Sequence, residues 1–143
     1  MPPTNDMRTD VPDDAGVYTQ ALAEILARIP PRWGRHIDVD SGWYPLITEV
    51  DRQLRNLDPD YIVHQVKQKF GTLRYYCWPS GDEPSRSTLD AFESITEQAE
   101  RVSAVTCERC GGAESSLCHQ ANGLHVRTLC SSCAGTLNYE SSN

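Results

Sequence analysis

The stretch YIVHQVKQKFGTLRYYCW, residues 61–78, decides the fold class of this chain. It is rich in Tyr, Ile, Val and Thr, which favour the pleated, half-buried backbone of a β-strand. Phe70-Gly71 lies at its centre and is the natural place for the chain to reverse. The stretch therefore predicts a β-hairpin whose strands span about 61–69 and 72–78.

Apolar residues recur at helical spacing on both sides of this hairpin. The periodicity predicts helices over about 15–29 and 43–57 before it, and over about 88–105 after it. Pro30-Pro31 and Asp58-Pro59 end the first two helices. Candidate N-cap residues are Asp13 or Asp14, Ser41, and Ser85 or Ser87. The residues expected on the buried faces are Tyr18, Leu22, Ile25, Leu26, Ile29, Trp43, Leu46, Ile47, Val50, Leu54, Leu57, Leu89, Phe92, Ile95, Ala99 and Val102.

The segment that follows the third helix holds five of the six cysteines. Four of them form two Cys-x-x-Cys pairs, Cys107/Cys110 and Cys130/Cys133, separated by nineteen residues. Two such pairs at this separation are typical of a structural zinc site, in which four thiolates close a tetrahedron around the ion. Asn122-Gly123 between the pairs is a strong hairpin signal, and this hairpin would bring the pairs together. The sequence therefore predicts a C-terminal zinc ribbon that binds structural Zn²⁺.

Other residues near the four cysteines compete as metal ligands. Cys118, His119 and His125 lie between the two pairs, and a Cys₃His site would use one of the histidines. We interpret Cys118 as a small buried hydrophobe and Cys77 as a buried strand residue. The alternative to a metal is a redox dithiol or a disulfide pair, which is the weaker interpretation for a chain without a secretion signal.

Together these elements predict a mixed α+β fold with two helices, a β-hairpin, a third helix and a C-terminal zinc ribbon. The chain of 143 residues, with 38% hydrophobic and 23% charged residues, has the size and composition of one globular domain. We expect a flexible tail over 1–14, an α+β domain over 15–105, the ribbon over 106–138 and a frayed end over 139–143.

Net charge and hydropathy argue against several classes of protein. The formal charge is −7, from 13 basic and 20 acidic side chains, which disfavours sequence-independent gripping of nucleic-acid backbones. No apolar run approaches the roughly 18 residues needed to span a bilayer, and the N-terminus has no apolar signal-peptide core. We therefore expect a soluble cytoplasmic protein with no membrane partner.

Two charged surfaces are candidates for contact with a partner. The hairpin concentrates basic and aromatic side chains, a combination that suits single-stranded nucleic acid or a protein interface. The third helix carries an acidic stripe at helical spacing, which suits a basic partner. For the hairpin the alternative is a half-buried sheet that packs its aromatic side chains on the helices while the charges stay solvated. For the third helix it is a solvated face without a binding role. The candidate contact residues are Lys67, Lys69, Phe70, Arg74, Tyr76, Asp90, Glu93, Glu97 and Glu100.

Strand alternation predicts which hairpin side chains share a face. The face that holds the two lysines of the first strand is expected to carry Tyr61, Val63, Gln65, Lys67 and Lys69. The corresponding group on the second strand is Arg74, Tyr76 and Trp78.

No established catalytic constellation is recognisable. Asp38 and Asp40 form a carboxylate pair that could chelate Mg²⁺ together with His36, because strand alternation would place all three on one face. No further acidic cluster or Gly-rich phosphate loop supports this chemistry, so a metal-dependent hydrolase is the weakest alternative. His64 has no serine or carboxylate at a sequence spacing that would indicate a catalytic pair.

Three motifs follow one another: GWYPLI at 42–47, HQVKQKFGTLRYY at 64–76, and the cysteine pairs within VTCERCG at 105–111 and TLCSSCA at 128–134. Over roughly 41–134 the chain resembles a group of small, largely uncharacterised proteins encoded by bacteriophages and prophages. That group carries a G-W-x-P-L-I helix start, a Q-V-K-x-K-F-G-x-L-R-[FY] hairpin and a terminal four-cysteine zinc ribbon. The resemblance implies no established activity. It implies a phage accessory protein that acts on host machinery inside the bacterial cell.

On these grounds we expect a non-catalytic, zinc-stabilised binding protein whose partner is a host or phage protein. Inhibition of a bacterial enzyme or of a host-defence component is one concrete form of this role. The main alternative is a zinc-ribbon protein that binds nucleic acid or has a regulatory role. No small-molecule substrate is evident, and the sequence leaves open which charged surface makes the contact.

Overall fold

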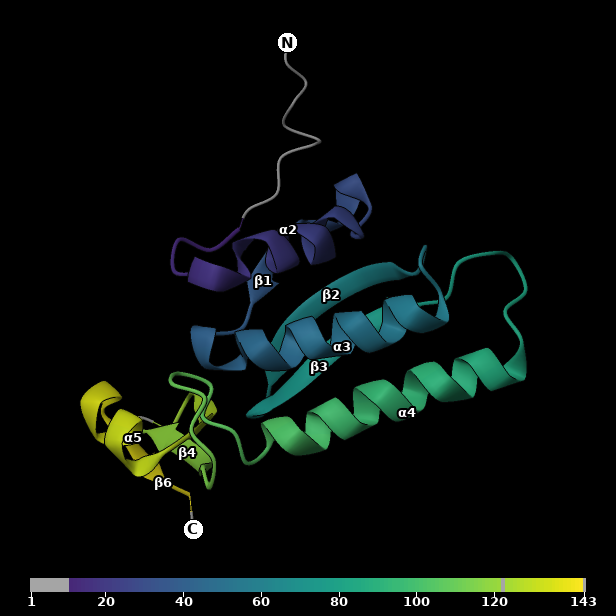
Figure 1. Ribbon diagram of the computed structural model, residues 1–143. Coiled ribbons are helices and arrows are strands. Elements are labelled where there is room, and N and C mark those ends of the chain that lie inside the picture. The colour runs from purple at the N-terminus through teal and green to yellow at the C-terminus, as the bar shows by residue number, and fades with distance from the viewer. Residues whose placement is uncertain (1–10, 122, 143) are drawn as a thin grey trace.

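The structure, a computed structural model, describes residues 11–121 and 123–142 and has a mixed α+β fold, which confirms the predicted fold class (Figure 1). Helices α2 (Thr19–Ala27), α3 (Tyr44–Leu57) and α4 (Arg86–Ser103) pack with a three-stranded sheet. A smaller C-terminal unit with its own sheet lies at the C-terminal end of α4 (Figure 1).

The main sheet has the order β1-β2-β3. Strand β2 (Ile62–Lys69) pairs with β3 (Thr72–Trp78) as the predicted antiparallel hairpin. Phe70 and Gly71 form its turn with φ of 56° and 84°, and left-handed backbone at both positions matches the twist of the flanking strands. A short strand that the sequence does not predict, β1 (Ile37–Asp38), adds a parallel edge to β2.

A β-bulge between Val63 and Gln65 changes which β2 side chains point toward the helices. Val63 and Val66 are both fully buried, whereas Gln65 is exposed. The extra residue, His64, shifts the alternation by one, because a bulge sets two residues against one on the partner strand. The expected grouping of the two β2 lysines with Val63 on one face is therefore wrong.

The main core lies between this sheet and the helices. Most of the predicted buried stripes belong to it, but Leu57 and Val102, in the last turns of α3 and α4, are 51% and 37% exposed. The largest fully buried side chains of this core are Leu22, Ile25, Leu26, Ile29, Trp43, Ile47, Leu54, Tyr61, Val63, Val66 and Leu73.

The helix starts agree with the sequence only in part. Ser85 caps α4 as predicted, because its hydroxyl accepts a hydrogen bond from the Thr88 N–H. Ser41 does not cap α3; it lies in a 3-10 turn, η3 (Ser41–Trp43), which the carboxylate of Asp40 caps. The predicted Asp caps of the first helix are also wrong, since the chain enters α2 through another 3-10 turn, η1 (Gly16–Tyr18), without a side-chain cap.

The predicted N-terminal tail lies mainly in residues 1–10, which are outside the described residues. Where the description begins, the chain already makes side-chain contacts with the body of the protein. The Asp14 carboxylate accepts a hydrogen bond of 2.8 Å from the Tyr44 hydroxyl at the start of α3.

The C-terminal unit contains a second sheet with the order β5-β4-β6. Strands β4 (Ser116–Gln120) and β5 (Val126–Leu129) form the predicted hairpin, and Asn122 in its connection lies outside the described residues. The sequence does not predict helix α5 (Ser131–Leu137). The expectation of a frayed end is corrected, because the chain reverses after α5 and β6 (Tyr139–Ser141) pairs with β4.

Asp51 on α3 is the centre of a buried polar cluster and is only 3% exposed. Its carboxylate accepts a hydrogen bond of 2.5 Å from the Tyr61 hydroxyl and lies 3.3 Å from Arg28 Nε and 3.2 Å from Arg55 Nε. The Tyr61 hydroxyl also shares a hydrogen bond of 2.7 Å with the Tyr75 hydroxyl on β3. The cluster therefore ties α2 and α3 to the hairpin.

The Asp51→Ala variant is expected to lower the free energy of unfolding by about 3–5 kcal/mol, because it leaves Arg28 and the Tyr61 hydroxyl buried without this partner. Urea denaturation measures the effect. Asp60→Ala, at an exposed position, is the control and should change stability by less than about 0.5 kcal/mol. Equal stabilities of the two variants would contradict the role given to this cluster.

Candidate metal centre

The two cysteine pairs converge in the C-terminal unit. The Sγ atoms of Cys107, Cys110, Cys130 and Cys133 all lie within 4.8 Å of one another. The Sγ atoms of Cys110 and Cys130 are 3.7 Å apart, close to the roughly 3.8 Å edge of a tetrahedron with metal–sulfur bonds of about 2.3 Å. Within 11–121 and 123–142, no other group of three or more His, Cys, Asp or Glu side chains gathers in this way. The four cysteines could therefore hold a metal ion such as zinc.

Local turns explain why each pair directs both sulfurs inward. After the first pair, Gly111 adopts a left-handed φ of 83°, and its N–H donates to the Cys107 carbonyl over 2.8 Å. In the second pair, Cys130 is the N-cap of α5 and Cys133 lies in the first turn of that helix. One tight turn and one helix start thus form the site.

Backbone N–H groups also point at the sulfurs. The Cys110 N–H donates to Cys107 Sγ, and the Cys133 N–H donates to Cys130 Sγ, each over 3.4 Å. Burial by itself raises the pKa of the Cys107 thiol, but backbone N–H donors, among them those of Cys110 and Cys130, outweigh it and lower the pKa to about 7. At Cys107 this favours the thiolate form that a metal ligand must adopt. Burial and the neighbouring thiols instead raise the pKa of Cys133 to about 12, so an ion would have to displace the proton there.

The competing ligands lie outside this cluster. Cys118 is buried on β4, which agrees with its interpretation as a small hydrophobe. His119 Nδ1 lies 3.1 Å from Ser142 Oγ, and His125 is exposed. Cys77, expected to be buried, is only half-buried; partial burial nevertheless raises the pKa of its thiol to about 12.

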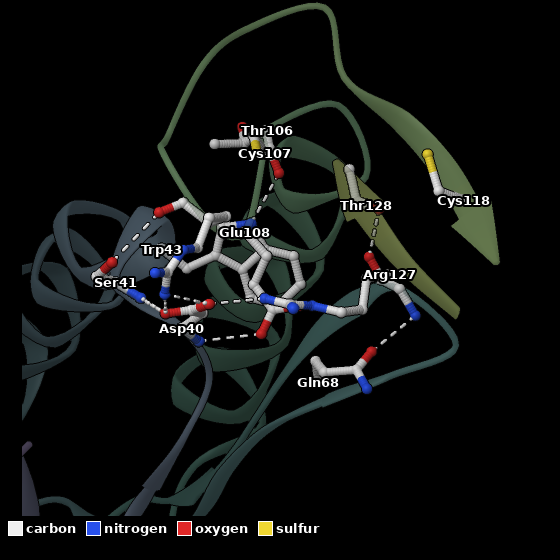
Figure 2. A network of polar contacts seen from close by, with 12 residues as sticks. Asp40, Ser41, Trp43, Gln68, Thr106, Cys107, Glu108, Cys118, Arg127 and Thr128 are labelled. Carbon is white, nitrogen blue, oxygen red and sulfur yellow. Dashed lines mark hydrogen bonds and ion pairs between the residues drawn. The ribbon is translucent and has the colours of Figure 1, made fainter. Parts of the chain in front are cut away.

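The first cysteine pair is docked on the body of the protein at Gly42. The Gly42 N–H donates to the Glu108 carbonyl over 2.7 Å. Beside it, the Trp43 Nε1–H donates to the Thr106 carbonyl over 2.8 Å (Figure 2). A Cβ atom on Gly42 would lie 2.3 Å from the carbonyl oxygen of Cys107. Only glycine allows the two backbones to approach so closely.

A charged network surrounds this contact (Figure 2). Arg127 on β5 lies between two carboxylates, with Nη2 2.7 Å from Asp40 Oδ2 and Nε 3.2 Å from Glu108 Oε1. Arg109 adds a second cation, 3.2 Å from Asp40 Oδ1. Burial raises the pKa of Glu108, whereas for Asp40 the opposing effect of burial is outweighed by hydrogen bonds from Ser41 and Arg127, and its pKa is lowered.

A second contact fastens the C-terminal unit to the hairpin turn. The buried Thr128 hydroxyl on β5 donates to the Gly71 carbonyl over 2.6 Å. A Cβ atom on Gly71 would lie 2.4 Å from Leu117 Cδ1 of β4. The GWYPLI and KFG motifs of the sequence therefore both supply glycines against which the C-terminal unit packs.

The predicted Mg²⁺ chelate is not assembled. Asp40 belongs to the network with Arg127, whereas Asp38 Oδ2 lies 3.2 Å from His36 Nε2 on the exposed side of β1. The alternation that would align the two carboxylates stops at Asp38, the last residue of β1. His64 stacks its ring on Trp33, with 4.6 Å between the ring centroids.

The two charged surfaces predicted from the sequence form one continuous surface. The face of the main sheet that points away from the core, here termed the outer face, joins α4 at Arg74, whose Nη2 lies 3.8 Å from Glu100 Oε2. Thr72 of β3 lines a hollow with Glu97 and Glu100. The outer face comprises Gln65, Lys67, Lys69, Thr72, Arg74, Tyr76 and Trp78, as the pairing register and the burial pattern show.

The remaining candidate contact residues border this face. Phe70, at the hairpin turn, is 69% exposed. Asp90 and Glu93 are exposed on the N-terminal half of α4. Trp33, which sequence reasoning did not select, lies against His64 at the bulge; its only sequence signal is a tryptophan in a short polar stretch after Pro30-Pro31.

No protein-family model matches the chain, and neither the curated proteins nor the solved structures give a significant match. No helix in the described part of the chain combines the length and apolar character that crossing a bilayer requires. The functional argument therefore rests on the site and on the surfaces around it.

The Gly42→Ala variant is expected to destabilise the protein by more than about 3 kcal/mol, because the atoms that its Cβ meets belong to rigid backbone. Chemical denaturation of the metal-loaded protein measures the loss. Gly135→Ala in α5 is the matched control, since a Cβ there meets no atom within 4 Å. Similar stabilities for the two variants would show that the close approach at Gly42 does not contribute to the free energy of unfolding.

Proposed function

We propose that the chain is a non-catalytic, zinc-stabilised binding protein that contacts a protein partner through its outer face. The observation that carries this proposal is the set of aromatic rings left uncovered on this face and, for Trp33, beside it at His64. Trp33, Tyr76 and Trp78 are 57%, 41% and 48% exposed. Exposed Trp and Tyr side chains close to Arg are the composition from which the energetic centres of protein interfaces are built.

Zinc is the proposed ion, because four thiolates at tetrahedral spacing are its usual ligand set in structural sites. Held by Cys107, Cys110, Cys130 and Cys133, it would cross-link the C-terminal unit and leave no open coordination position for a substrate. A structural role also suits the small core of this unit, which is too limited to be stable by itself. Its buried residues are Cys107, Cys118, Leu129 and Ala134.

The charge distribution supports a protein partner over a nucleic acid. Lys67, Lys69 and Arg74 would attract phosphates, but Glu100 lies 3.8 Å from Arg74, and Glu97 lines the same hollow as Glu100, so both carboxylates would repel the same groups. The formal charge of −7 adds to this repulsion. A protein surface that presents both signs of charge can pair with both stripes.

The motif resemblance to phage-encoded proteins supports placing this role inside an infected bacterium. A host enzyme or a host-defence component is the corresponding target. The separation of Asp40 from His36 and Asp38 supports a non-catalytic role, because the one carboxylate pair suggested for catalysis is divided between an ion-pair network and an exposed strand end.

Native mass spectrometry of the wild type is expected to show one zinc ion per chain. Cys110→Ser should lose the ion and unfold at lower temperature, because one of four ligands is removed. Cys118→Ser is the matched control, since it changes a buried cysteine outside the cluster and should retain the zinc. A metal-free chain with disulfides between the two pairs would refute the zinc site.

The contact role is tested by affinity capture from nuclease-treated host lysate with purified, metal-loaded protein. A stoichiometric protein partner should be retained by the wild type and reduced about tenfold or more by Tyr76→Ser/Trp78→Ser. Leu57→Ser is the control, because Leu57 is 51% exposed at the end of α3, away from the outer face. A partner retained equally by all three proteins would show that the outer face is not the contact surface.

A further inference from the structure

We infer that the outer face binds a second copy of this chain, so that the free protein is a two-fold symmetric dimer. The inference rests on the contact role proposed for this face and names its occupant in the absence of any other partner. A two-fold interface requires a surface that complements itself, because every contact between two residues across the interface occurs twice. The outer face has this property in the arrangement of its charges.

The charges are arranged in parallel stripes. On β2, Lys67 stands opposite Arg74 of β3, and Arg74 in turn lies 3.8 Å from Glu100 of α4. At this level along the strands, the order across the face is therefore Asp38 of β1, Lys67 of β2, Arg74 of β3 and the acidic side chains of α4. Glu97 lies next to Glu100 in the same hollow beside Thr72.

A two-fold axis along β3 makes these stripes complementary. A rotation of 180° about this axis leaves each residue at the same position along the strand direction but moves it to the other side of β3. Strand β2 of one copy therefore faces α4 of the other. Lys67 then meets Glu97 and Glu100, and the same pair forms again across the axis. Each acidic stripe is thereby neutralised by the basic stripe of the other copy.

Exposed apolar surface lies close to these charges. On the β2 side, Trp33 projects from its stack on His64 and is 57% exposed. A cleft of about 440 Å³ extends from His64 to α4 and is lined also by Trp78 and Leu89. Because Trp33 stacks on His64, Trp33 and this cleft are neighbours, and a second copy on the outer face would cover both.

The polar groups of this face have few partners within one chain. In the described part of the chain, Glu93 and Glu97 form no ion pair. Lys67 and Lys69 lie over the rings of Tyr76 and Phe70, at 5.9 and 5.7 Å from the centroids. These contacts leave both charges accessible for pairing with a second copy.

Sedimentation equilibrium of the zinc-loaded full chain tests the inference. The wild type should reach twice the chain mass of 16.0 kDa, with a dissociation constant on the order of micromolar. Lys67→Glu and Glu97→Lys should each weaken the dimer about tenfold or more by opposing like charges, and the Lys67→Glu/Glu97→Lys double variant should restore it. Trp33→Ser should also weaken it, whereas Leu57→Ser should not.

Three results would overturn the inference. They are a wild type that is still monomeric at about 100 μM, a dimer dissociation constant unchanged by Trp33→Ser, and a double variant that dimerises no more tightly than the single variants. Circular dichroism melting of each variant separates loss of the dimer from loss of the fold. A monomer whose outer-face variant still loses the lysate partner would refute the dimer and leave the proposed function standing. A dimer that shows all the expected responses, with no partner captured from lysate, would refute the host-protein target and leave the dimer standing.

Discussion

The close approach of the Gly42 backbone to the first cysteine pair is the constraint on which the rest of the structure depends. It allows the Glu108 carbonyl to receive the Gly42 N–H and the Thr106 carbonyl to receive the buried Trp43 indole. These contacts fix the start of α3, and α3 carries much of the main core. Since Cys107 and Cys110 flank Glu108, an ion bound by the cysteines would hold the same backbone in place, so that metal binding and packing of α3 stabilise one another.

The charged network around this contact serves orientation more than stability. Removing Arg127, Asp40 and Glu108 from water is costly, and their mutual attraction offsets this cost only while every partner is in position. A small rotation of the C-terminal unit would leave the Glu108 carboxylate, which is 4% exposed, without its cation. The network therefore penalises wrong docking geometries.

Sequence reasoning recovers the features that depend on local pattern and misses those that depend on distant contacts. The hairpin with its Phe70-Gly71 turn, the Ser85 cap and the convergence of the four cysteines follow from neighbouring residues and fixed spacing. The bulge at His64 is not visible in the pattern, because nothing in strict alternation marks the extra residue. The pairing of Asp40 with Arg127 joins residues 87 positions apart, and no motif links them.

The long separation between the docking partners has a consequence for the order of folding. The hairpin and α4 are joined by contacts between nearby elements, which form quickly because little loop entropy is lost. The contact between Asp40 and Glu108 spans 68 positions, and that between Gly71 and Thr128 spans 57. On a ribosome the last cysteine pair emerges only after the body of the chain has been made. The main core, Ala15 to Ala99, precedes both cysteine pairs in the chain. An ion bound by all four cysteines could therefore be held only after the second pair has joined a core that is already synthesised.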